Sequence, residues 1–182
     1  MQVKKSIVLC SMIVSLLVSG VFAAGAVDVP KNTFKKPKEA SYTGARFCLW
    51  PNIAWPPAKT IKYVEGMNIG LVSFGKDGYV IGADTGLVSL SNYVRGAQVA
   101  LYGQGLVMEG AQVCLVNINK NVIGAQVGIY NGTDVMEQGA QVGIVNNAKK
   151  SDAIQIGLIN IMENGFLPVF PFFNYPKSWH SK

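Results

Sequence analysis

Few side chains in this 182-residue chain have the types and spacing that catalysis, metal binding or phosphate binding requires. The only histidine, His180, stands two residues before the C-terminus, so a Ser-His-acid or Cys-His arrangement built on it is not expected. No His/Cys cluster has zinc spacing, and no phosphate-binding loop with its lysine is present. The sequence therefore predicts a protein that is not an enzyme and that carries no cofactor and no metal.

The carboxylates are sparse, and they share no repeat position. A calcium-binding repeat would place an aspartate at the same site in every copy, which this one does not. A carboxylate pair of the glycosidase type can combine residues that are far apart in sequence. A hydrolase therefore stays an alternative. The carboxylates fall mainly in variable segments: Asp77, Asp84, Glu109, Asp134, Glu137, Asp152 and Glu163.

Two cysteines, Cys48 and Cys114, lie beyond the N-terminal leader. An exported protein meets an oxidising compartment, where a disulfide is permitted. Cys114 occupies a repeat position that other copies fill mostly with glycine, which indicates a small buried residue. We expect two free, packed thiols.

The secondary structure that must position these side chains is predicted by an internal repeat. Seven copies of one eight-residue phrase follow one another in steps of 14 to 16 residues, which predicts one structural unit stacked on itself. A unit of about 14 residues is too short for two helices, and its recurrent glycine argues against a continuous helix. The copies begin at Gly66, Gly82, Gly96, Gly110, Gly124, Gly139 and Ala153.

Each position of the repeat has its own chemistry. The first is glycine in six copies, which indicates a left-handed turn or a close approach of two chains. The third is most often glutamine and the eighth most often asparagine, and identical amides in register can hydrogen-bond along a stack. We predict a structural ladder of Gln98, Gln112, Gln126, Gln141 and Gln155, with Asn117, Asn131, Asn146 and Asn160.

The second to seventh positions have the composition of a strand, in which alternate side chains point to opposite faces. We expect the alanine, valine and leucine or isoleucine of the second, fourth and sixth positions to fill a narrow dry core. The predicted fold is all-β: a single-domain parallel β-solenoid of about seven 14-residue coils with aromatic and proline-rich caps. The alternative is an antiparallel outer-membrane β-barrel.

The predicted organisation begins with a signal peptide at 1–23, whose cleavage follows Ala23 or Ala26. The alternative is a leader retained as an anchor, and no second apolar run has spanning length. A flexible lead-in covers 24–45, an N-terminal cap 46–65, the repeat solenoid 66–164, and a C-terminal cap and tail 165–182. The bulky aromatic residues of the caps are expected to plug the ends of the core.

The charge balance gives little sign of a charged partner. The net charge is +6, and it falls to +4 without Lys4 and Lys5 of the leader. Much of the remaining excess lies in Lys31, Lys35, Lys36 and Lys38, a run that is typical of a solvated tail. We expect no nucleic-acid partner.

The repeats of the pattern "GxQxGxxN", the upstream "FCLWPNIAWPP" and the closing "GLINIMENGFLPVFPFFN" together resemble the leptospiral-type surface repeat family of exported bacterial proteins. The resemblance covers roughly residues 46–174. The first two copies depart from the motif, with Asn68 and Asp84 where glutamine is usual, and Ser73 and Ser89 where asparagine is usual. The resemblance implies export and an envelope or surface setting, and it implies no known catalytic residue, cofactor or substrate.

The resulting hypothesis is an exported, non-enzymatic scaffold in the periplasm, at the outer envelope surface or outside the cell. Its partner would be an unknown protein or glycan, and its oligomeric state stays open. The candidate ligand-facing residues are Tyr102 and Tyr130. The alternative is a carbohydrate-binding module or hydrolase that uses the aromatic flanks, with Trp50 and Trp55 as candidates.

Overall fold

The computed structural model describes residues 42–50, 53–57 and 63–180, with the backbone alone for 42 and 74–77. The described residues belong to one compact unit. The predicted signal peptide, its cleavage site or retention as an anchor, the four lysines of the lead-in, and residues 181–182 lie outside the described residues. So do parts of the predicted N-terminal cap, at 51–52 and 58–62.

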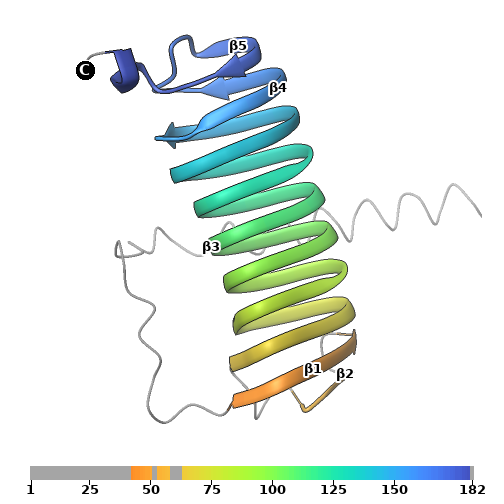
Figure 1. The fold of residues 1–182 in the computed structure, drawn as a ribbon. Helices are drawn as coiled ribbons and strands as arrows, with labels where there is room; N and C mark the ends of the chain where they lie inside the picture. Colours follow the sequence, from red (N-terminus) through yellow and green to blue (C-terminus); the bar gives the residue numbers. More distant parts are fainter. Residues whose placement is uncertain (1–41, 51–52, 58–62, 181–182) are drawn as a thin grey trace, which may run out of the picture. The chain divides into compact units, whose positions relative to one another are not determined.

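The described chain is almost entirely strand and forms a parallel β-solenoid of about six turns (Figure 1). The main element, β3 (Tyr63–Ser151), winds through the first six copies, and β4 (Ile154–Met162) is the seventh. Three short strands and one 3₁₀ helix complete it: β1 (Tyr42–Trp50), β2 (Ile53–Trp55), β5 (Val169–Asn174) and η1 (Lys177–His180). The predicted all-β solenoid is confirmed.

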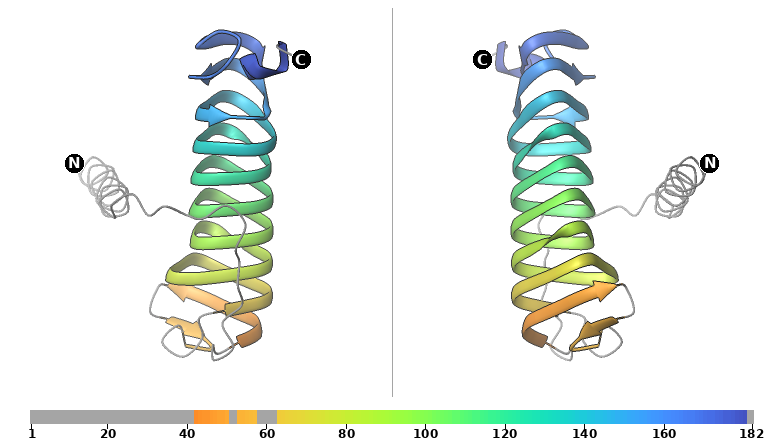
Figure 2. Two further views of the ribbon diagram at one scale, coloured as in Figure 1. Left: turned by 90° about the vertical axis from the view of Figure 1, so that its left-hand side faces the viewer. Right: turned by 90° about the vertical axis from the view of Figure 1, so that its right-hand side faces the viewer.

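The coils stack in register, so each repeat position lies above itself. Where β3 meets β4 in parallel, Gln141 pairs with Gln155 and Asn146 with Asn160. The same stacking runs along the successive coils in both side views (Figure 2). The antiparallel alternative requires neighbouring copies to run in opposite directions, which this register does not show.

Strand β1 is a further copy of the repeat, in addition to the seven predicted from the sequence. It pairs with β3 in parallel, Arg46 with Asn68 and Cys48 with Gly70, in the register that later copies share. The segment Gly44–Trp50, "GARFCLW", follows the same pattern as "GAQVCLV", with arginine in place of glutamine. This strand crosses the predicted boundary between the lead-in and the cap at 45–46.

An antiparallel strand lies on each end of the solenoid. The sheet order is β2-β1-β3-β4-β5, with β2 antiparallel to β1 and β5 antiparallel to β4. The aromatic residues of the first end do not plug the core as expected, because Trp50 is 59% and Trp55 71% exposed. At the second end Phe166, Phe170 and Tyr175 pack against one another, with ring centroids 5.7 and 6.1 Å apart.

The prediction of which face is inside was wrong. The third, fifth and eighth positions point into the solenoid, and the fourth and sixth point outward: Gln112 and Asn117 are fully buried, whereas Val113 and Leu115 are exposed. An amide that bonds to the coils above and below loses little on burial, so it can occupy the interior. Seven of the buried apolar residues form one cluster along the stack: Val64, Val80, Val94, Met108, Val122, Met136 and Ala153.

Candidate functional site

The first-position glycines form a corner at which successive coils approach closely. Their φ angles lie between 120° and 140°, a region that favours glycine. A Cβ on Gly139 would lie 1.7 Å from the carbonyl oxygen of Gly124, and a Cβ on Gly96 would lie 2.1 Å from that of Gly82. This corner sets the direction in which every following third-position side chain points.

The third-position glutamines are joined by a ladder of hydrogen bonds inside the solenoid. In each pair the later residue donates from Nε2 to Oε1 of the earlier one. The bond from Gln126 to Gln112 is 2.9 Å, from Gln141 to Gln126 2.8 Å, and from Gln155 to Gln141 2.7 Å. Gln112 donates to Gln98 in the same way. All five side chains are buried.

The eighth-position asparagines form a second ladder that runs in the opposite direction. Here the earlier residue donates from Nδ2 to Oδ1 of the later one, at 2.7 Å from Asn117 to Asn131 and 2.8 Å from Asn131 to Asn146. The bond from Asn146 to Asn160 is also 2.8 Å. Each Nδ2 donates in addition to a backbone carbonyl; Asn131, for example, bonds Val142 at 3.0 Å. Both amide hydrogens are thus used.

The opposite directions explain two buried acceptors that have no partner among the described residues. These are Oδ1 of Asn117 and Oε1 of Gln155. Asn117 is the first donor of its ladder, and Gly103 in the preceding coil has no side chain to donate to it. Gln155 is the last donor of its ladder, and no further glutamine follows. The unfilled acceptors are therefore the two ladder ends.

Gly103 and Cys114 reverse the usual order of a large and a small residue. Later copies have asparagine at the eighth position and glycine at the fifth position of the next coil. In later copies, a fifth-position glycine leaves room for the asparagine of the preceding coil: a Cβ on Gly128 would lie 2.7 Å from Asn117 Nδ2. Between the third and fourth copies the asparagine is missing, and Cys114 occupies the space. A Cβ on Gly103 would lie 2.7 Å from Cys114 Sγ. The thiol therefore fills the space of an absent amide.

The carboxylate of Asp84 replaces a glutamine at the start of the ladder and accepts four hydrogen bonds. Asn68 Nδ2 donates to Oδ1 at 2.7 Å, while Ser91 Oγ at 3.0 Å and Gln98 Nε2 at 3.1 Å donate to Oδ2. Ser89 Oγ donates to the same oxygen. Asp84 is fully buried. Its lone pairs are used inside the solenoid and are not available to a ligand from solvent.

Both cysteines are free and buried. They occupy the fifth position four coils apart, about 19 Å at the spacing of adjacent strands, which is too far for a disulfide. Burial raises the pKa of the Cys114 thiol to about 11 and also raises the pKa of Cys48. At neutral pH these thiols are protonated and unreactive.

The four candidate ligand-facing residues do not form one site. Tyr102 and Tyr130 are half-buried and lie two coils apart. The Tyr102 hydroxyl donates to Gln104 Oε1 at 3.0 Å, and burial raises its pKa. Trp50 and Trp55 lie at the β1–β2 end of the sheet and are exposed. The tryptophans present open aromatic surface, whereas the Tyr102 hydroxyl is bonded within its own coil.

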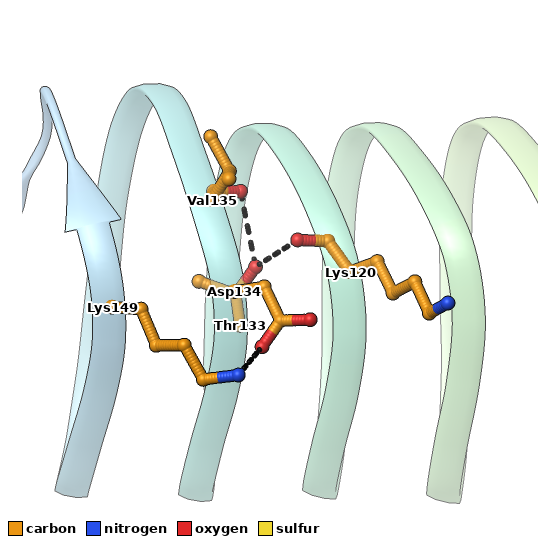
Figure 3. A network of polar contacts seen from close by, with 5 residues as sticks. All are labelled: Lys120, Thr133, Asp134, Val135 and Lys149. Atoms are coloured by element: carbon orange, nitrogen blue, oxygen red, sulfur yellow. Dashed lines mark hydrogen bonds and ion pairs between the residues drawn. The ribbon is translucent and has the colours of Figure 1, made fainter. Parts of the chain in front are cut away.

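The variable half of the coils carries the charged residues and links neighbouring coils (Figure 3). Thr133 Oγ1 lies 3.2 Å from the carbonyl oxygen of Lys120 and 3.1 Å from that of Val135. Lys149 Nζ lies 2.7 Å from Asp134 Oδ1 in the preceding coil. The ion pair between Lys149 and Asp134 is an exposed cross-coil contact, and pairs of this kind contribute little to stability.

The largest regular surface feature consists of residues whose hydropathy predicts a place in the core. The second, fourth and sixth positions point outward along the whole repeat array, and we call this surface the aliphatic face. Among its 21 residues none is charged and Thr85 alone is polar. Its exposed members at the fourth and sixth positions are Ile69, Leu71, Leu87, Val99, Leu101, Val113, Leu115, Val127, Ile129, Val142, Ile144, Ile156 and Leu158.

The histidine considered as a catalytic candidate lies at the C-terminal end of the described chain. His180 lies in η1, where its Nε2 is 2.6 Å from the hydroxyl of Tyr175. Across the described residues there is no group of three or more histidine, cysteine or acidic side chains placed to hold a metal ion. In the same part of the chain, no helix has both the length and the apolar character that crossing a bilayer requires.

Comparisons of the chain with protein-family models, with curated proteins and with solved structures returned no match.

Proposed function

We propose that this protein is an exported, non-enzymatic repeat protein that serves as an interaction scaffold at the bacterial envelope or cell surface. One observation carries the proposal: the coils keep their amides, Asp84 and both thiols inside and present a continuous aliphatic face outside. The repeat amides and the Asp84 carboxylate are committed to internal hydrogen bonds. An exposed apolar face of this length is typical of an interaction surface.

Export is supported by the leader composition and by the resemblance of the repeats to leptospiral-type surface proteins. The test is fractionation of the native host with N-terminal sequencing of the mature protein. We expect a product that begins near Ala24 or Val27 in the periplasmic, envelope or extracellular fraction. An unprocessed product in the cytoplasm would contradict the proposal.

A second candidate function is carbohydrate binding at the β1–β2 end. The observation that favours it is the exposure of Trp50 and Trp55, since exposed indole rings are suited to stacking on apolar surfaces. Binding on a glycan array that is lost in Trp55→Ala, with an unchanged circular dichroism spectrum, would support it. Retained glycan binding in both Trp50→Ala and Trp55→Ala would contradict it.

A further inference from the structure

The aliphatic face is too large and too uniform for an ordinary exposed surface. The eight stacked copies of the repeat, β1 included, cover about 38 Å at the strand spacing, and five strand positions cover about 17 Å. The projected area is about 650 Å², at the upper limit of the largest apolar patch on a typical monomer. Phe47 and Leu49 of β1 are exposed and extend the face by one coil.

We propose that the aliphatic face is covered by the aliphatic face of a second copy of this chain, in a twofold symmetric dimer. Two such faces bury about 1,300 Å² in total, within the range of specific, stable protein interfaces. A twofold interface uses the same patch on both subunits. A face without charge satisfies that condition, because no like charges meet across it.

The spacing of the side chains also favours a second copy. The outward residues form straight ranks that repeat at the strand spacing of about 4.8 Å. A second solenoid has the same repeat, so its ranks fit between those of the first along the full length without drifting out of register. Stacked sheets pack about 10 Å apart with their inner side chains interdigitated, which valine, leucine and isoleucine permit.

The charges near the face disfavour an anionic lipid surface. A helix or sheet that binds such a surface usually adds lysine or arginine to its apolar residues. Here Arg95, beside the corner, pairs with Glu109 at 3.4 Å, and Lys149 pairs with Asp134 at 2.7 Å. The aliphatic face itself has no basic residue. An uncharged protein surface is the better match.

The test is sedimentation velocity of the purified protein, as processed by its host, in detergent-free buffer. We expect a dimer at micromolar concentrations and at least a tenfold weaker association in Leu115→Lys, which places a charge at the centre of the face. The matched control is Leu167→Lys, because Leu167 is 43% exposed, close to the 49% of Leu115, and lies outside the face. The control should remain a dimer.

If Leu115→Lys does not fold, as judged by circular dichroism, the double variant Val113→Thr/Leu115→Thr replaces it, since threonine is compatible with a strand. A monomeric wild-type protein up to about 100 μM overturns the proposal. An unchanged dimer in the folded face variants also overturns it. Flotation of a monomer with phosphatidylglycerol vesicles, lost in the face variant, would overturn it and assign the face to a membrane.

This inference rests on the proposed function only in treating the face as an interaction surface. Fractionation of the host tests export, whereas ultracentrifugation tests self-association of the purified protein. A cytoplasmic dimer would contradict the proposed function alone, and an exported monomer would contradict the dimer alone.

Discussion

Replacing Gly103 by asparagine and Cys114 by glycine together should destabilise the protein far less than the two single substitutions would suggest. The double variant converts the exchanged pair to the arrangement of later copies, in which an asparagine lies over a glycine. The new amide can donate to Oδ1 of Asn117, the unfilled end of the asparagine ladder. The prediction therefore tests whether the thiol fills the space of the missing amide.

The magnitudes follow from the contacts. Gly103→Asn places a Cβ 2.7 Å from Cys114 Sγ, and overpacking of this kind costs about 1–3 kcal/mol. Cys114→Gly removes a buried methylene and thiol and adds a glycine to a strand, about 2 kcal/mol together. Independent effects would sum to about 4 kcal/mol.

In the double variant the clash is relieved, the space is refilled, and one or two hydrogen bonds form, each contributing about 1 kcal/mol. Some cost remains, because the Cβ at position 103 also lies 2.8 Å from Gln98 Oε1 and Gln112 Nε2. We expect a net loss of about 1 kcal/mol and hence a coupling energy of about 3 kcal/mol, at the upper end of that for neighbouring residues.

The assay is urea unfolding at fixed protein concentration, followed by circular dichroism, for the wild type, both single variants and the double variant. The matched control cycle combines Gly103→Asn with Cys48→Gly, the same change in the same column but three coils away from Gly103. Those two effects should add. A coupling energy near zero for Gly103 and Cys114, or equal coupling in both cycles, would refute the reasoning.

Three further predictions concern the corner, the buried carboxylate and the thiol. Gly139→Ala would place a Cβ 1.7 Å from a carbonyl oxygen and should lower the free energy of unfolding by more than about 3 kcal/mol. The control is Gly44→Ala, whose Cβ would meet only the carbonyl oxygen of Glu65 at 3.8 Å, and its urea melt should be nearly unchanged. Asp84→Ala leaves four donors without their acceptor and should cost at least about 3 kcal/mol; a loss below 1 kcal/mol would show that water replaces the carboxylate. The Cys114 thiol keeps its proton to about pH 11 in the folded chain but ionises near its ordinary pKa of about 9 when unfolded, so stability should fall as pH rises between these values, by about 1.4 kcal/mol per unit. Cys114→Ala should remove that part of the pH dependence in melts from pH 8 to 11.

The stacking of the coils could be predicted from the sequence because it follows from spacing. Identical residues that recur every 14 or so positions, with glycine at a constant place, require one unit stacked in register. The glutamine and asparagine columns follow from the same spacing, and hydrogen bonds join their members in the structure.

The inside of the coil could not be predicted in the same way. Alternation shows which residues share a face, but it does not show which face is buried. Hydropathy alone favoured Val113 and Leu115 for the core, yet Gln112 and Gln126 occupy it, because their amides hydrogen-bond to glutamines of the neighbouring coils. These hydrogen bonds between coils form only once several coils are stacked.

Two further features left signals in the sequence that were not used. β1 was missed because the eight-residue insertion containing β2 lengthens the step from Gly44 to Gly66 to 22 residues. The exchange at Gly103 and Cys114 is visible as a glycine at an eighth position followed by a bulkier residue at the next fifth position. Its meaning needed the contact between them.

An amide interior beneath an aliphatic surface also shapes how stability depends on temperature. Exposure of apolar surface raises the heat capacity on unfolding, whereas exposure of polar surface lowers it. In an isolated protomer the fourth- and sixth-position side chains are already about half in water, and the interior that unfolding hydrates contains two ladders of amides besides its apolar cluster. The heat-capacity increment per residue should therefore fall below the usual 12–15 cal/mol/K or so, which flattens the stability curve and moves cold denaturation to lower temperature.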